Sequence, residues 1–286
     1  MILGSVTRAR ADSVRATAIR SLPRGWMAGG KGPDRMDTPT KFYDALAPDY
    51  HLLFDDWWSA AQWHGGVIAD LLAARGVTGG RLLDCTCGVG TQALPLAALG
   101  YRVIGTDVSA AAINRARAEA SARGLDVELA VKDVRDRIEG VFDVVISCDN
   151  ALPHLLRDED LERALGSIHG CLQPDGLLLA SIRDYDSMRQ SRPNGVPISV
   201  YGRPGTRHGS GQVWQWSAEA EYVDIELFTL TETAPGTWHA RSGTTRYRAL
   251  RRATLDHLLK SVGFTTTEWL MPEHSGYYQP IVIARR

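Results

Sequence analysis

Apolar and polar residues follow one another in two different ways along this chain, and the first pattern covers residues 81 to about 184. Short apolar runs, each followed by a helix-like stretch, stand near residues 81–84, 102–106, 126–131, 141–147 and 176–182. This alternation of strands and helices favours a parallel sheet with helices on both faces. We therefore expect an α/β fold with a Rossmann-like, doubly wound sheet of about seven strands.

The second pattern begins after Asp186, where period-two alternation predicts antiparallel strands. It covers residues 212–219, 222–233 and 237–250, with Ala234-Pro235-Gly236 as a turn. A helix over 252–262, stopped by Gly263, then leads to the last two sheet strands at 265–270 and 279–284. The antiparallel part is thus an insertion, and we expect it to lie as a lid over the carboxyl ends of the sheet, where ligands bind in such folds.

The residues before the sheet predict a helical N-terminal cover. Two short, aromatic-rich helical pieces lie within residues 42–58, and apolar spacing continues through Trp63, Ile68 and Leu72. Residues 1–35 contain six arginines and two acidic residues and lack such a pattern, so we expect a disordered extension or one that arises from an upstream start codon. The resulting division is an extension (1–40), a cover (41–78), a cofactor-binding core (79–186), an insertion (187–250) and a C-terminal helix with the last core strands (251–286).

Composition narrows the class of protein. A chain of 286 residues with 44% hydrophobic content can bury a core without disulfides or metal, and a net charge of −1 gives no basic footprint for nucleic acid. The four cysteines (85, 87, 148 and 171) lack the spacing of a zinc site, so no metal is expected. No apolar run approaches the roughly 20 residues that cross a bilayer. We expect a cytoplasmic protein with reduced cysteines and no membrane role.

The most informative motif is the glycine-rich turn after the first predicted strand. Asp84 ends that strand, and Cys87, Gly88 and Gly90 follow in the turn that opens the next helix. Glycines there let backbone amides approach a ligand closely and adopt φ values that other residues resist. Asp107 ends the second strand, where a carboxylate can accept both hydroxyls of a ribose. The sequence therefore predicts a nucleotide-type cofactor site.

These residues, followed by Lys132-Asp133-Val134 and the strand Phe142–Ser147, resemble the ordered motifs of class I S-adenosylmethionine-dependent methyltransferases. The resemblance implies that Asp84 and the Cys87–Gly90 backbone hold the methionine portion of the cofactor and that Asp107 holds the ribose. It also implies that Asp133 bonds the adenine amino group, while Val134 packs on the ring and Val108 lies beside the cofactor. The alternative is a nicotinamide-dependent dehydrogenase, which the missing third glycine disfavours.

Polar side chains follow the fourth and fifth predicted strands. Asp149, Asn150 and His154 come off the fourth strand, and Arg183 ends the fifth, so all four are expected at the ligand-binding edge. Arg183 can bind a carboxylate through two parallel hydrogen bonds. A histidine titrates near neutrality and can take a proton from an acceptor.

Within the class, Asn150-x-x-x-His154-Leu155 and Arg183-x-Tyr185-Asp186 are similar to the glycine N-methyltransferase branch and its bacterial small-molecule relatives. The resemblance implies that Asn150 and Arg183 face the amine and carboxylate of an amino acid acceptor. It also places Tyr43 in the active site and the Cys148 backbone at the methionine end of the cofactor. Asp149 departs from the small uncharged residue of that branch, and Trp57–His64 lacks its arginine for the cofactor carboxylate, so we expect a different acceptor from glycine and another cofactor anchor.

Each of these side chains also has a purely structural interpretation. Asp149 or Asn150 can cap the next helix, His154 can be a buried hydrogen-bonded histidine, and Arg183 can pair with a carboxylate that follows it. The large aromatic side chains of the cover and the insertion either fill the core or form a pocket for an aromatic or apolar acceptor, which we favour: Tyr50, Trp57, Trp58, Trp214 and Trp216. Tyr277 and Tyr278 precede the last strand, and both interpretations stay open for them.

The predicted function is S-adenosylmethionine-dependent methylation of a small molecule that is an amine, an amino acid derivative or indole-like. N-methylation is favoured over C- or O-methylation, with Asn150 and Arg183 positioning the acceptor and Asp149 or His154 directing a proton. A nucleic-acid methyltransferase is less compatible, because base N-methylation usually shows Asn/Asp-Pro-Pro-aromatic after the fourth strand and this segment does not. A cofactor-binding protein without catalysis stays an alternative, and a homo-oligomer is compatible with the sequence.

Overall fold

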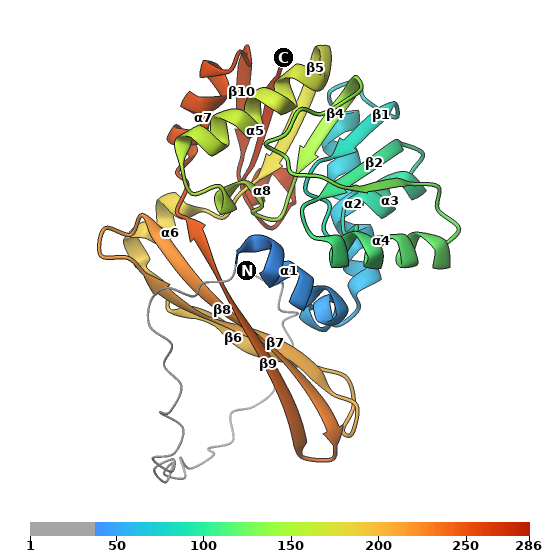
Figure 1. Cartoon of the computed structure of the whole chain (residues 1–286), viewed down its shortest axis with the longest axis vertical. Coiled ribbons are helices and arrows are strands. Elements are labelled where there is room, and N and C mark those ends of the chain that lie inside the picture. Colours follow the sequence, from blue (N-terminus) through green and yellow to red (C-terminus); the bar gives the residue numbers. More distant parts are fainter. Residues whose placement is uncertain (1–37) are drawn as a thin grey trace. The chain divides into compact units, whose positions relative to one another are not determined.

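The computed structural model describes residues 38–286, so nearly all of the predicted extension lies outside the described residues. A seven-stranded sheet with the order β10-β11-β5-β4-β1-β2-β3 forms the core (Figure 1). Its strands are β1 (Arg81–Asp84), β2 (Arg102–Asp107), β3 (Glu128–Val131), β4 (Phe142–Ser147), β5 (Leu172–Ser181), β10 (Thr266–Leu270) and β11 (Ile281–Arg285). Strands β1 to β5 pair in parallel, and β11 is antiparallel to both of its neighbours. The expected doubly wound α/β fold is confirmed.

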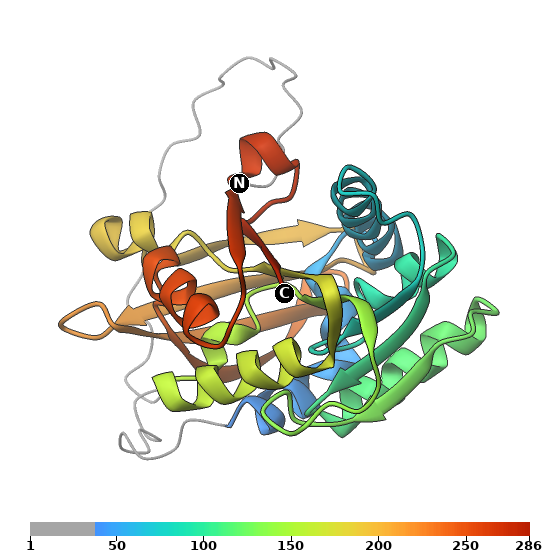
Figure 2. The same ribbon diagram turned by 90° about the horizontal axis from the view of Figure 1, so that it is seen from above.

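Strands buried on both faces account for the two helical layers (Figure 2). Leu82 of β1 packs with one hydrophobic cluster and its neighbour Leu83 with another, because successive side chains of a strand point to opposite faces. The helices α2 (Trp57–Ala73), α3 (Ala93–Ala98) and α4 (Ala110–Ala122) contribute to the first cluster. The second cluster contains α5 (Asp158–Cys171) and α7 (Arg252–Ser261).

The predicted insertion forms a separate antiparallel sheet of four strands. Its strands are β6 (Gly195–Tyr201), β7 (His208–Trp216), β8 (Tyr222–Ala234) and β9 (Thr237–Arg248), paired in that order. The short helix α6 (Tyr185–Ser191) leads into this sheet, and α8 (Pro272–Ser275) precedes β11.

Two strands differ from the prediction. Strand β6 was not expected, because Pro197 and the nearby Gly195 are typical of loops; it is an edge strand, where a proline removes no inner hydrogen bond. Strand β5 begins at Leu172 rather than near residue 176. The pairing of β4 with β5 shifts register between Phe142 and Val144, so the turn-like residues after Leu172 form an irregularity within the strand.

The N-terminal cover joins the two sheets. It consists of α1 (Pro39–Leu46), the 3-10 helix η1 (Ala47–Leu53) and α2, and α1 lies between the sheets in Figure 1. Phe42 of α1 packs beside Gly243 of β9, 3.2 Å from where a Cβ atom would stand. On its other side, Asp44 accepts hydrogen bonds from the Ser109 hydroxyl (2.6 Å) and the Ala111 amide (3.1 Å) at the start of α4. The insertion is thereby held close to the carboxyl edge of the core sheet.

We expect Gly90→Ala to destabilise the protein by about 2 kcal/mol. Gly90 has φ +92°, and a Cβ atom would lie 2.7 Å from Leu94 Cγ, so backbone strain and overpacking add. Gly124→Ala is the control, because Gly124 also has positive φ (+63°) but its Cβ would meet nothing within 4 Å. Urea unfolding measures both variants, and equal losses of unfolding free energy would show that packing on Leu94 is unimportant.

Candidate active site

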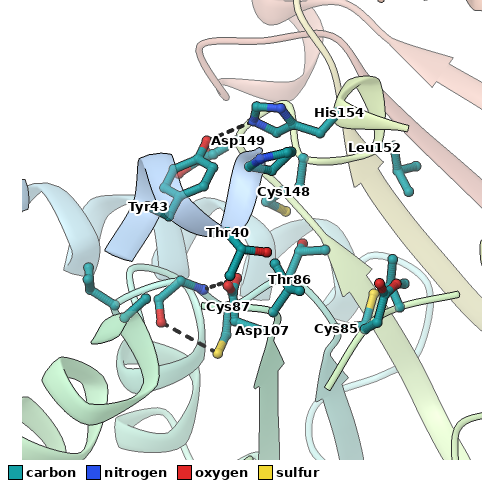
Figure 3. Close-up of a pocket in the computed structure, with 18 of the residues that line it drawn as sticks. Thr40, Tyr43, Cys85, Thr86, Cys87, Asp107, Cys148, Asp149, Leu152 and His154 are labelled. Carbon is teal, nitrogen blue, oxygen red and sulfur yellow. Dashed lines mark hydrogen bonds between the residues drawn. The ribbon is translucent and has the colours of Figure 1, made fainter. Parts of the chain in front are cut away.

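A cavity of about 410 Å³ opens where the carboxyl ends of β1, β2 and β4 meet the N-terminal cover (Figure 3). Most of the predicted site residues line it: Tyr43, Cys87, Gly88, Asp107, Val108, Asp133, Val134, Cys148, Asp149 and His154. Its size falls within the usual range for small-molecule and cofactor sites. The structure therefore brings together residues from four strand ends and from α1.

The turn after β1 is shaped for close approach of a ligand. The Cys87 amide donates to the Thr106 carbonyl at 2.9 Å, which ties the turn to β2. Gly88 has φ +53° and lines the cavity, and a Cβ atom there would meet nothing within 4 Å. Gly90 does not line the cavity, and its lack of a side chain serves packing on Leu94 instead.

Asp107 lies at the end of β2 with its carboxylate in the cavity wall. One oxygen accepts from the Gly88 amide and the other from the Ser109 amide, both at 2.9 Å. Burial raises the pKa of Asp107, while these backbone donors oppose the rise. Because each carboxylate oxygen has a second acceptor position, Asp107 can also accept the two hydroxyls of a ribose.

Asp84 is the other carboxylate of the motif, and it lies behind the cavity wall. Its Oδ1 accepts from the Thr86 amide at 3.3 Å, whereas Oδ2 is buried and has no hydrogen-bond partner among residues 38–286. Burial raises its pKa well above the usual value. An orphaned buried acceptor beside the glycine turn fits a polar ligand group that reaches this turn.

The end of the cavity formed after β3 contains a side chain that the sequence analysis missed. Arg135 binds both oxygens of Asp133 (Nε to Oδ1 3.0 Å, Nη2 to Oδ2 2.7 Å) and also reaches Asp160 at 3.1 Å. The hydrogen bond from Arg135 lowers the pKa of Asp133. The signal in the sequence that could have identified Arg135 is its position two residues after Asp133 of the motif.

Asp149 projects into the rim of the cavity. Its Oδ1 accepts from the hydroxyls of Tyr277 (2.6 Å) and Tyr278 (2.7 Å), and its Oδ2 accepts from Gln92 Nε2 (2.7 Å). The helix-capping interpretation is wrong for Asp149, because the 3-10 helix η2 (Leu152–His154) begins after Ala151 without a side-chain cap. The carboxylate is directed at the ligand side of the strand end.

Asn150 is oriented differently from what the resemblance implies. It is 1% exposed and does not line the cavity. Its Oδ1 accepts from the Arg183 amide (3.0 Å) and its Nδ2 donates to the Tyr185 hydroxyl (2.9 Å). With both side-chain groups bonded inside the protein, Asn150 links the chain segments after β4 and β5 instead of facing a ligand.

Tyr43 and His154 connect the N-terminal cover to the rim of the cavity. The Tyr43 hydroxyl lies 3.1 Å from His154 Nε2 and 3.2 Å from the Tyr247 hydroxyl of β9. The His154 and Tyr247 rings pack against each other at a tilt of 34°, with centroids 4.0 Å apart. Burial lowers the pKa of His154 to about 3, and the nearby Arg183 guanidinium adds to the effect. His154 is therefore neutral and a weak base near pH 7, which disfavours the expected role in proton removal.

We expect His154 to make the protein acid-sensitive. Its folded pKa of about 3 lies below the usual 6.5, so the unfolded chain binds the proton over this range and the free energy of unfolding falls as pH decreases from about 6.5. The expected slope is about 1 kcal/mol for each pH unit. Unfolding at pH 5 and pH 7.5 should show a smaller pH dependence for His154→Gln than for the unchanged protein, and parallel curves would contradict this assignment.

Arg183 lies just beyond the cavity, against the insertion. Its guanidinium carbon is 5.0 Å from the Trp214 ring centroid and 5.1 Å from that of Tyr247. Its Nη1 is buried without a hydrogen-bond partner, and it forms no ion pair within residues 38–286. The alternative pairing with the following carboxylates is wrong, because Arg252 occupies Asp184 (2.6 Å) and Asp186 (3.4 Å).

The aromatic side chains divide between core and site. Tyr50 lines the cavity, whereas Trp57 and Trp58 pack in the cluster between the cover and α4. Trp214 and Trp216 belong to the core of the insertion, although Trp214 also covers Arg183. Residues at the site that the sequence analysis did not single out are Thr91, Gln92 and Tyr247. Thr91 and Gln92 directly follow Gly90 in the glycine-rich turn, whereas Tyr247 comes from β9, which is distant in sequence.

Residues 38–286 contain no group of three or more His, Cys, Asp or Glu side chains placed to hold a metal ion. Within those residues, no helix is both long enough and apolar enough to cross a membrane.

Comparisons with known proteins agree with this geometry. Residues 82–176 match a family model described as a methyltransferase domain. A glycine/sarcosine N-methyltransferase of Parasynechococcus marenigrum (strain WH8102) is 27% identical over 248 residues, which cover 82% of this chain and 81% of that protein. A glycine/sarcosine N-methyltransferase of Halorhodospira halochloris is 30% identical over 136 residues, covering 46% of this chain and 50% of the relative.

Solved structures share the fold. Streptomyces venezuelae DesVI superposes with a TM-score of 0.68 at 20% identity, covering 85% of this chain and 96% of that one. CalS10, an amino pentose methyltransferase from Micromonospora echinaspora solved with bound S-adenosylmethionine, gives a TM-score of 0.65 at 19% identity, covering 85% of this chain and 96% of that one. The matched methyltransferase domain and the sequence relatives support a class I S-adenosylmethionine-dependent methyltransferase, and the solved structures support its fold.

Proposed function

We propose that this enzyme methylates a nitrogen of a small molecule that carries an amine and a carboxylate. The observation that carries the proposal is a pair of opposite charges beside the end of the cavity. Arg183 has no carboxylate partner and Asp149 accepts only from neutral donors, among the residues that the structure describes. Buried or half-buried charges are normally paired, so an acceptor with both charges would complement them.

The proposed cofactor contacts follow the geometry of the cavity. Asp107 would hold the ribose and Asp133 the adenine amino group, with Val108 and Val134 beside the rings. The turn at Cys87 and Gly88, together with the Cys148 backbone and Asp84, would hold the methionine end. Bound S-adenosylmethionine supplies an electrophilic methyl group on a positively charged sulfur.

The remaining residues would align the acceptor and exclude water. Arg183 would bind its carboxylate, with the flat guanidinium kept in orientation by Trp214 and Tyr247. Tyr43 connects the cover to β9 through Tyr247, which closes the cavity from the insertion side. Asn150 would act by fixing the Arg183 backbone, and so it is a positioning residue in this proposal. In this division, residues 79–186 would bind the cofactor, residues 251–286 complete the core sheet, and residues 41–78 and 187–250 cover the site.

The relatives support the choice of nitrogen. Two similar sequences are named glycine/sarcosine N-methyltransferases, and KedS8 from Streptoalloteichus, named a sugar N-methyltransferase, shares the fold with a TM-score of 0.66 at 18% identity, covering 91% of this chain and 98% of that one. All three act on nitrogen by name. The acceptors in their names differ from one another. The acceptor of this enzyme therefore has to be inferred from the charges and the cavity of its own site.

Calorimetric titration with S-adenosylmethionine and S-adenosylhomocysteine comes first, followed by a panel of amino acids, amines, indoles and phenols. Formation of S-adenosylhomocysteine reports turnover, and NMR of the product locates the methyl group. A methylated amine on an amino acid-like compound supports the proposal. Turnover on oxygen or carbon contradicts it, as does cofactor binding without turnover on any nitrogen of the panel.

A further inference from the structure

The hydrogen bonds of Asp149 leave one acceptor position open to a ligand. A carboxylate has about four such positions. Tyr277 and Tyr278 use both positions of Oδ1, and Gln92 uses one of Oδ2. The second Oδ2 position accepts nothing from residues 38–286, and Asp149 lines the cavity. A donor in the cavity can therefore complete the set.

Within residues 38–286, no side chain with a fixed positive charge forms an ion pair with this carboxylate. Of the residues that line the cavity, only Lys132 and Arg135 carry such a charge, and both follow β3 at the opposite end. His64 Nδ1 is 3.9 Å from Oδ2, beyond hydrogen-bond distance. Burial lowers the pKa of His64, although Asp149 opposes this, so His64 is largely neutral at pH 7 and above. The Asp149 side chain is 20% exposed, so its charge is only partly hydrated.

The chain holds Asp149 in a strained conformation. Asp149 and Asn150 have φ +57° and +68°, which are uncommon for residues other than glycine. The Asp149 amide donates to the Ser181 hydroxyl (2.8 Å), which itself donates to Gln279 Oε1 (3.0 Å). Strained residues at a ligand-facing strand end are typical of functional positions, because the surrounding bonds must maintain them.

We propose that Tyr277 and Tyr278 position Asp149 to bind a positively charged or strongly basic amine nitrogen of the acceptor. This rests on the proposed function and narrows its substrate class, since an indole nitrogen would leave the carboxylate charge uncompensated. A cationic donor at Oδ2 forms a charge-assisted hydrogen bond, which is about twice as strong as a neutral one. An ammonium group must first release a proton to water, because only the neutral amine has the lone pair that forms the N–C bond as the bond from the methyl group to the sulfur of S-adenosylmethionine breaks. The nitrogen gains positive charge during this displacement, and the carboxylate that accepts its remaining N–H stabilises that charge as it develops.

The binding test uses the protein loaded with S-adenosylhomocysteine, which cannot transfer a methyl group. Sarcosine, tryptophan and phenylethylamine are compared with their counterparts without nitrogen or with only an indole nitrogen: acetate, indole-3-propionate and ethylbenzene. We expect at least one amine to raise the thermal midpoint more than its counterpart, and Asp149→Asn to abolish the difference. Equal shifts within every pair would overturn the proposal.

The turnover test separates positioning from folding. We expect Tyr278→Phe to raise the KM for the acceptor amine about 10-fold. The double variant Tyr277→Phe, Tyr278→Phe should raise this KM more strongly. The affinity for S-adenosylhomocysteine should stay within twofold. Tyr101→Phe is the control, because Tyr101 donates a 3.0 Å hydrogen bond to the Val77 carbonyl away from the cavity. An unchanged KM in the double variant would contradict the role of the tyrosines.

The two proposals fail in different ways. Turnover on an indole nitrogen would retain N-methylation and overturn the inference about Asp149. Turnover on oxygen or carbon would contradict the proposed function, whatever the binding test shows. Loss of cofactor affinity in Asp149→Asn equal to the loss of amine affinity would assign Asp149 to the cofactor and would also overturn the inference.

Discussion

Arg183→Ala is expected to lower kcat/KM for the acceptor at least 100-fold, which corresponds to about 2.7 kcal/mol of transition-state stabilisation. The guanidinium carbon lies 5.0 Å from the Trp214 ring and 5.1 Å from the Tyr247 ring, and its buried Nη1 has no hydrogen-bond partner within residues 38–286. Removing a rigid, unpaired cation would remove the partner of the acceptor carboxylate. Steady-state kinetics with the acceptor found by the panel measures the effect.

Two variants control for charge and for general loss of stability. Arg183→Lys keeps the charge but not the flat edge with parallel donors, so we expect it to recover only part of the activity. Arg246→Ala removes an arginine of the insertion that already pairs with Asp224 at 2.6 Å, and it should have little effect on kcat/KM. If Arg183→Ala weakened binding of S-adenosylhomocysteine as much as it lowered kcat/KM, Arg183 would support the fold or the cofactor site instead.

Asp107→Ala is expected to weaken binding of S-adenosylmethionine and S-adenosylhomocysteine 10- to 100-fold, or about 1.4–2.7 kcal/mol. The carboxylate would bind the ribose hydroxyls, and it also accepts from the amides of Gly88 and Ser109 at 2.9 Å. Its loss therefore removes ligand contacts and loosens the glycine turn. Calorimetric titration measures both affinities.

The matched variants separate these effects. Asp107→Asn keeps one acceptor oxygen and most of the volume, so its loss of affinity should be smaller than that of Asp107→Ala. Asp126→Ala changes an exposed aspartate before β3 and should bind the cofactor normally. Normal binding by Asp107→Ala would remove Asp107 from the ribose site.

The cofactor half of the site was predictable because its residues belong to local motifs. Gly88 lies a few residues after β1, and Asp107 ends β2, so hydrophobic periodicity placed both at one edge of the sheet. Parallel strands point their carboxyl ends to that edge whatever the rest of the chain does. Strand β6 was not predictable in this way, because a proline such as Pro197 is tolerated in a strand mainly at a sheet edge or a bulge. Both depend on the pairing of the whole sheet.

The acceptor side depended on contacts between segments far apart in sequence. Asn150 was expected to face a ligand, but its amide group bonds the Arg183 backbone and the Tyr185 hydroxyl. Tyr247, from the insertion, packs against His154 with ring centroids 4.0 Å apart. Burial of His154 lowers the pKa of its imidazole to about 3. No local pattern contains the degree of burial of a side chain, so its protonation could not be derived from the motif.

The sequence by itself determined the fold class, the two kinds of sheet and the cofactor turn, because strand and helix periods and glycine geometry are properties of neighbouring residues. The tertiary structure decided which charges at the rim are paired. Arg252 takes the carboxylates next to Arg183, and the C-terminal Tyr277 and Tyr278 hold Asp149. These outcomes required the folded chain, because an ion pair or hydrogen bond depends on distances between groups that are more than 60 residues apart in the sequence.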